Sequence, residues 1–118
     1  LSRHVRFFGP QSDIRPFYQF ADLLAIPSFY DPFANVTVEA LAMGLFVISS
    51  RYNGGSEILH SKNGLIIEDL LDPESLTRAL EVGLKHPKTN ESAAASRNSV
   101  KHLDFSSQMN LFMKACLE

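Results

Sequence analysis

Residues 27–48 read PSFYDPFANVTVEALAMGLFVI, and this order predicts the end of a strand, a loop, a helix, a turn and the next strand. The apolar run Leu23–Ile26 stops at Pro27, which has no N–H group to donate to a sheet. Leu45–Ile48 is a second apolar run of strand length. Because both runs are almost wholly apolar, they predict an α/β fold whose parallel sheet is covered by helices on both faces.

The helix in this stretch carries the first candidate site. Asn35 is placed to cap a helix over Val36–Met43, and Gly44 is placed to end it in a left-handed turn. A loop that enters a helix presents free backbone N–H groups and the positive end of the helix dipole, which bind anions such as phosphate. Glu39 lies about one turn inside the helix, where an acidic side chain commonly accepts hydrogen bonds from a ribose. Asp31 stands in the loop before it.

Strands and helices alternate along the rest of the chain. The ligand crevice of such a sheet lies beyond the carboxyl ends of its strands, which predicts one rim built from Gly9–Asp13, Ser28–Asn35 and Arg51–Gly55. The glycines of the last segment allow positive φ and close backbone approach. The further expected elements are strands over Val5–Phe8 and Leu65–Ile67, and helices over Ile14–Phe20 (capped by Ser12 or Asp13), Ser56–Ser61 (capped by Ser56), Glu74–Lys85 (capped by Asp72, after Pro73), Ser92–Leu103 and a last one capped by Ser106 or Ser107.

Composition limits the class of protein. With 118 residues and 45% hydrophobic content, the chain is one globular domain rather than a disordered tail. A formal net charge of −2 argues against a nucleic-acid partner, because nucleic-acid binders carry basic patches. The single cysteine, Cys116, fits a reducing compartment. No apolar run approaches the ~18 residues of a membrane-spanning helix, so we expect a cytoplasmic protein, with peripheral contact at the inner face of the membrane left open.

Several short motifs follow one another in a specific order: Val5–Gly9, Ala21–Ser28, Asp31–Phe33, Val38–Gly44 with Val47 and Ile48, Asn53–Ile58 and Asn63–Ile67. Together they resemble the C-terminal, donor-binding domain of retaining glycosyltransferases of family 4, and they extend over more than half of the chain. Enzymes of that family have the GT-B fold, whose C-terminal domain is Rossmann-like, and use nucleotide-diphospho-sugars as donors. The resemblance implies no cofactor and no metal.

The resemblance gives the two carboxylates different roles. Glu39 matches the residue that accepts both ribose hydroxyls of the donor, although the helix dipole alone also favours a glutamate there. Asp31 matches a catalytic position at which the family typically has glutamate in contact with the transferred sugar. Because aspartate is one methylene shorter, this contact requires a shifted loop, a bridging water or a different sugar. The alternative for Asp31 is a turn residue ahead of Pro32.

The backbone is expected to bind the diphosphate. The resemblance implies that the N–H groups of Phe33, Ala34, Asn35 and Val36 hold it as it becomes the leaving group. The alternative is an ordinary capped helix, in which the Asn35 side chain only caps. Ser28 is expected to line the same pocket.

The predicted function is the donor-binding half of a glycosyltransferase that moves a sugar to a glycan or lipid-linked acceptor, as in bacterial envelope polysaccharide or lipopolysaccharide synthesis. Residues 1–118 are expected to form a single partial nucleotide-sugar-binding domain with a helical segment over 91–118. Because the chain opens on Leu1 without an initiator Met, we expect an N-terminally truncated piece. Compared with the resembled domain, it would lack the opening strand and helix and the Arg/Lys pair that neutralises the diphosphate. It would also lack the acceptor-binding domain, and it would be inactive alone.

Three alternatives come from other classes. A nucleotide-dependent dehydrogenase fragment is disfavoured because no Gly-x-Gly-x-x-Gly follows any predicted strand. A non-catalytic flavodoxin-like module would bind partners through its terminal helices, over Ser92–Leu117. Glycoside hydrolysis by Asp31 and Glu39 ranks lowest, because it would leave the phosphate-type loop between them without a purpose.

Overall fold

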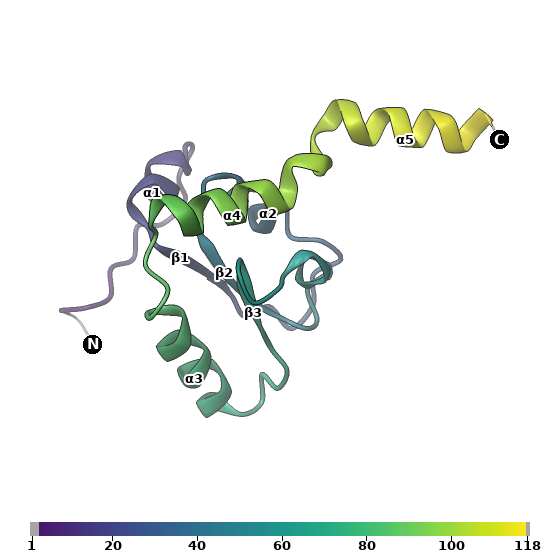
Figure 1. The fold of residues 1–118 in the computed structure, drawn as a ribbon. Helices are drawn as coiled ribbons and strands as arrows, with labels where there is room; N and C mark the ends of the chain where they lie inside the picture. The colour runs from purple at the N-terminus through teal and green to yellow at the C-terminus, as the bar shows by residue number, and fades with distance from the viewer. Residues whose placement is uncertain (1–2, 118) are drawn as a thin grey trace.

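The computed structural model describes residues 3–117 and contains, within that range, one parallel sheet of three strands (Figure 1). The strands are β1 (Leu23–Ile26), β2 (Phe46–Ser50) and β3 (Gly64–Ile67), in the order β1-β2-β3. In the register, Leu24 lies beside Val47 and Val47 beside Gly64. All five residues of the central strand β2 are buried, as expected for a strand covered on both sides.

The helices cover both faces of this sheet (Figure 1). Helix α3 (Pro73–Gly83) packs on one face, and α1 (Arg15–Phe20), α2 (Asn35–Ala42) and α4 (Asn90–Val100) lie on the other. The predicted α/β, Rossmann-like class is therefore confirmed. The α-helices are α1 (Arg15–Phe20), α2 (Asn35–Ala42), α3 (Pro73–Gly83), α4 (Asn90–Val100) and α5 (Phe105–Leu117), with the 3₁₀ turns η1 (Gly54–Ile58) and η2 (Lys101–Leu103).

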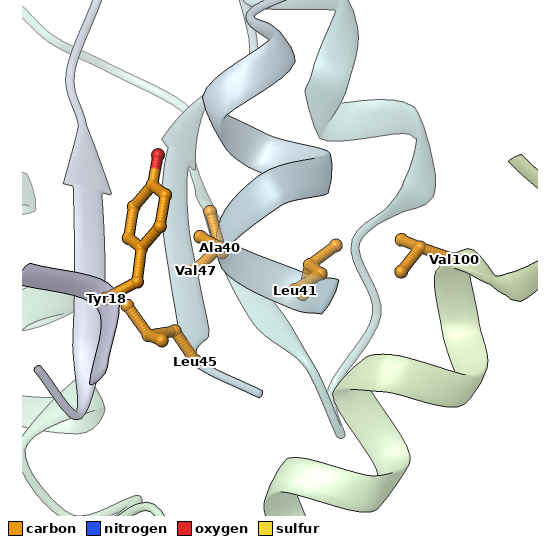
Figure 2. Close-up of a cluster of buried hydrophobic side chains, with 6 residues drawn as sticks. All are labelled: Tyr18, Ala40, Leu41, Leu45, Val47 and Val100. Carbon is orange, nitrogen blue, oxygen red and sulfur yellow. The ribbon is translucent and has the colours of Figure 1, made fainter. Parts of the chain in front are cut away.

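The larger core cluster lies between β2 and the three helices on the same face. Figure 2 shows Val47 of β2 near Leu41 and Tyr18, with Val100 of α4 closing the cluster. Each fully buried aliphatic side chain of this kind stabilises the fold by about 1.5–3 kcal/mol relative to an exposed one. This cluster fixes α2, and with it the loop that enters α2.

The opposite face carries a second cluster. Phe46 and Ile48 alternate with Val47 along β2, so they point to the other side and pack against Ile67 and against Ala79 of α3. The start of α3 is as predicted, with Pro73 in the first turn and the Asp72 carboxylate accepting the N–H of Glu74 at 3.0 Å.

The strand predicted over Val5–Phe8 is wrong. The segment has no strand in the structure, and Phe7 is 95% exposed. A strand needs a neighbour to take up its hydrogen bonds, and β1 pairs only with β2 among residues 3–117. Phe8 instead packs edge-on against Phe17 of α1, with ring centroids 5.0 Å apart.

Several predicted helix caps are also wrong. Asn35 is the first residue of α2, the cap position is Ala34, and no side chain caps this helix. Ser56 lies inside η1, whose cap is the side chain of Asn53. The predicted turn at Gly44 is confirmed by its φ of +82°.

Three further helix starts differ from the prediction. Ile14 is the cap position of α1, with the Asp13 carboxylate accepting the N–H of Arg15 at 3.0 Å. The fourth helix begins earlier than predicted, after a capping box on Thr89 and Ser92. The last begins after Asp104, whose carboxylate accepts the N–H of Ser107. Among residues 3–117, no helix is long and apolar enough to cross a membrane.

Candidate functional site

The candidate site lies at the carboxyl ends of β1 and β2, where the loop after each strand meets the start of α2. Backbone hydrogen bonds join the two loops: the Asp31 N–H donates to the Tyr52 carbonyl at 3.2 Å, and the Gly54 N–H donates to the Asp31 carbonyl at 3.0 Å. At the base of the loops, the Ser50 hydroxyl donates to the carbonyl of Ser28. The structure thus brings together two of the three predicted rim segments.

The third predicted segment, Gly9–Asp13, takes no part in these backbone hydrogen bonds. Gly9 and Gln11 line an apolar cavity of about 360 Å³ against α1 and β1. This cavity shares no lining residue with the loops over 28–35 and 51–55.

Asn53 holds the two loops together, a role that the sequence analysis missed. Its side chain is fully buried, and its Oδ1 accepts the N–H groups of Ala34 at 3.0 Å and Gly55 at 2.9 Å. Its Nδ2 donates to the hydroxyl of Ser49 in β2 at 2.9 Å. The available signal was an asparagine between a strand and two glycines, because its amide can both donate and accept.

The two glycines after Asn53 are needed for space rather than for positive φ. Among residues 3–117 only Gly9 and Gly44 have positive φ, so Gly54 and Gly55 do not adopt the positive φ that glycine allows. A Cβ on Gly54 would lie 2.0 Å from the Pro32 carbonyl oxygen, and one on Gly55 would lie 2.7 Å from Thr37 Oγ1. The predicted close backbone approach is therefore present.

The four amides expected to bind the diphosphate are not equivalent. The Phe33 N–H donates to Asp31 Oδ1 at 3.0 Å, and the buried Ala34 donates its N–H to Asn53. Within residues 3–117, the N–H groups of Asn35 and Val36 have no hydrogen-bond partner, as is usual for the first turn of a helix. These two free amides lie at the positive end of the α2 dipole, the arrangement at which helix N-termini bind anions in other proteins.

The two candidate carboxylates differ in their surroundings. Asp31 is partly buried, and among the described residues its carboxylate accepts a hydrogen bond only from the Phe33 N–H. Glu39 is exposed at the first turns of α2, and its Oε2 accepts a hydrogen bond of 3.0 Å from the hydroxyl of Tyr18. Burial and the adjacent Glu39 carboxylate raise the pKa of Tyr18 to about 12, so this hydroxyl is a neutral donor.

Comparison with known proteins assigns the chain to a family. A family model described as glycosyl transferases group 1 matches residues 1–86. The chain is 38% identical over 82 residues to the lipopolysaccharide core biosynthesis glycosyltransferase LpsE of Rhizobium meliloti, a match that covers 69% of this chain and 24% of that protein. It is 30% identical over 104 residues to the D-inositol 3-phosphate glycosyltransferase of Salinispora tropica, which covers 86% of this chain and 21% of that protein.

A solved structure agrees with these matches. The sucrose-phosphate synthase of Thermosynechococcus elongatus superposes with a TM-score of 0.73 at 25% identity, over 88% of this chain and 27% of that one. The chain spans about a quarter of the length of the curated relatives it matches. These findings favour the glycosyltransferase prediction over the dehydrogenase and flavodoxin-like alternatives. The chain belongs to the glycosyl transferases group 1 family and has a Rossmann-like fold of the GT-B type.

Proposed function

We propose that the chain is the donor-binding part of a retaining glycosyltransferase that moves a sugar from a nucleotide-diphospho-sugar to a glycan or lipid-linked acceptor. The observation that carries the proposal is the pairing of two free amides, of Asn35 and Val36, with an exposed carboxylate, Glu39, one turn further along α2. A nucleotide diphosphate needs donors for its phosphates and acceptors for its ribose hydroxyls. Both kinds of group are present at one end of one helix.

The amides of Asn35 and Val36 stabilise the leaving diphosphate. Charge accumulates on its oxygens as the bond to the sugar breaks, and fixed N–H donors stabilise that charge without reorganising. Ala34 anchors the loop through Asn53 instead of binding the phosphate itself. The Phe33 amide becomes a third donor once the Asp31 carboxylate leaves it for the sugar.

Asp31 contacts the hydroxyls of the transferred sugar and is the catalytic candidate. It lies on the loop that Asn53 and Tyr52 hold in place, so its backbone is fixed while its short side chain exchanges partners. Ser28, whose carbonyl accepts the Ser50 hydroxyl at the base of the same loop, would line the donor site. The mechanism uses no metal and no cofactor.

The whole protein would combine this chain with a domain that binds the acceptor and with basic residues for the diphosphate. Residues 1–118 would then be a partial nucleotide-sugar-binding domain, inactive alone. The name of the Rhizobium relative supports a place in lipopolysaccharide or other envelope polysaccharide synthesis. Such a protein would work in the cytoplasm, at the inner face of the membrane where lipid-linked acceptors lie.

The test is calorimetric titration of the full-length gene product with UDP-sugars and GDP-sugars and with free UDP and GDP. Glu39→Ala is expected to weaken binding of both the sugar nucleotide and the free nucleotide by roughly 1.5–3 kcal/mol, the value of a hydrogen bond to a charged group. Asp31→Asn is expected to weaken only the sugar nucleotide, because Asp31 contacts the sugar. Glu81→Ala, on the exposed side of α3, is the matched control. Unchanged affinity in Glu39→Ala would remove this residue from the site.

A further inference from the structure

Tyr18 makes a contact that joins the core to the candidate site. Its side chain is 4% exposed and belongs to the core cluster between α1, α2 and β2. Figure 2 shows its ring beside β1, with the hydroxyl pointing in the direction of the strand, toward the carboxyl ends of the sheet. There the hydroxyl donates to Glu39 Oε2 at 3.0 Å.

Tyr18 is held in place through both its ring and its backbone. Its ring packs in a cluster with Ala40, Leu45 and Val47 (Figure 2). At its backbone, the Lys88 ammonium donates to the Tyr18 carbonyl at 2.8 Å. A donor fixed in this way can select one orientation of an exposed glutamate, which would otherwise sample several rotamers.

The contact occupies only one side of the carboxylate. Within residues 3–117, Glu39 Oε1 has no hydrogen-bond partner, so it is available to a ligand. A carboxylate has about four acceptor positions, and one phenol leaves the rest for a pair of vicinal hydroxyls.

We propose that Tyr18 is a positioning residue that holds the Glu39 carboxylate in the orientation that accepts the ribose diol of the donor. This inference rests on the function proposed above and adds a determinant of ribose recognition to it. The Tyr18 hydroxyl is protonated at physiological pH already at its ordinary pKa of 10.0, and burial and Glu39 raise that pKa further, so the hydroxyl acts as a donor. The competing explanation is that the bond only ties α1 to α2.

The experiment compares ribonucleotides with 2′-deoxyribonucleotides on the full-length gene product. UDP, GDP and their 2′-deoxy forms are titrated against wild type, Tyr18→Phe, Glu39→Gln and the double variant. Tyr18→Phe keeps the buried ring and removes only the hydroxyl. We expect it to weaken ribonucleotide binding by about three- to tenfold, the range for one hydrogen bond, and to change 2′-deoxy binding less. Gln19→Ala is the control, because this exposed residue next to Tyr18 on α1 makes no side-chain hydrogen bond within residues 3–117 and lies outside the candidate site.

The results separate the inference from the proposed function. If Glu39→Gln leaves ribonucleotide affinity unchanged, the proposed ribose contact fails. If Glu39→Gln weakens binding but Tyr18→Phe does not alter the preference for ribose, only the inference fails. An equal loss for ribo and deoxy forms in Tyr18→Phe, or the same loss when Tyr18→Phe is added to Glu39→Gln, would show a structural role and overturn it. Coupling of the two variants in the double-mutant cycle is the result we expect.

Discussion

At the candidate site, single side chains link different helices, strands and loops through hydrogen bonds. Asn53 bonds to Ala34, Gly55 and Ser49, and so fixes the loop before α2 against β2. Tyr18 reaches from α1 to Glu39. Such contacts decide which amides of the loop are free for a ligand and which are already used by the protein.

Asn53→Ala is predicted to lower the free energy of unfolding by about 2–3 kcal/mol, because it leaves the buried N–H groups of Ala34 and Gly55 without a partner and removes the donor to the Ser49 hydroxyl. It should also weaken nucleoside diphosphate binding, since the Asp31 loop loses its anchor. Chemical denaturation and calorimetry measure the two effects. Asn98→Ala, at an exposed position of α4, should change stability by less than about 0.5 kcal/mol. Equal stability of the two variants would contradict the role of Asn53.

Tyr18 predicts a dependence of stability on pH. Its pKa in the folded chain is about 12, against an ordinary value of 10.0. The folded state therefore holds this proton more tightly, and its contribution is fully present below pH 10, then lost as pH rises through 12. Denaturation curves across this window should show a steeper fall in stability for wild type than for Tyr18→Phe. Parallel curves would show that the Tyr18 pKa is not raised by folding.

At the scale of elements, close packing of helices on β2 sets where the site can form. Gly44 ends α2 with a φ of +82°, and α4 crosses directly over it. A Cβ on Gly44 would lie 2.7 Å from the Cβ of Ala93. The glycine therefore serves both the turn and the contact between α2 and α4.

Gly44→Ala and Gly9→Ala form a matched pair, because both positions have positive φ while only Gly44 is crowded. Gly9→Ala should cost about 1 kcal/mol of unfolding free energy, for the left-handed backbone alone. Gly44→Ala should cost about 1–3 kcal/mol more, because α4 must shift. Thermal or chemical unfolding measures the difference. Equal losses would indicate that α4 does not pack on Gly44 in solution.

Across residues 3–117, burial is highest in β2, and α5 at the C-terminal end has no buried residue. The structure extends over 55 × 31 × 30 Å, and Figure 1 shows α5 projecting away from the sheet. No residue of α5 is buried, and Phe105, Leu111, Phe112 and Leu117 are exposed on it.

The rate of amide hydrogen exchange should therefore differ strongly between β2 and α5. Amides of β2 are predicted to be the slowest to exchange, because all five residues are buried and the strand is paired on both sides. Amides of α5 should exchange fastest among the α-helices of eight or more residues. Mass spectrometry of the 118-residue chain gives this order. Protection of α5 equal to that of β2 would contradict it.

Local sequence patterns were enough to predict the fold class, several element boundaries and the family. The apolar runs at Leu23–Ile26 and Leu45–Ile48 were enough to predict two parallel strands, because strands buried on both faces are mostly apolar. Gly44 and Asp72 marked a helix end and a helix start through backbone preferences that do not depend on the rest of the fold. The order of short motifs was enough to predict the family.

Only the tertiary structure decided which segments pair as strands and which polar groups bond to one another. The run Val5–Phe8 has the composition of a strand but no partner strand, and pairing is a property of neighbours rather than of a segment. Four consecutive amides looked alike in the sequence, yet Asp31 and Asn53 take up those of Phe33 and Ala34. The bond between Tyr18 and Glu39 joins residues 21 positions apart. Hydrogen bonds between distant residues depend on where the folded chain places them, and no local propensity encodes that placement.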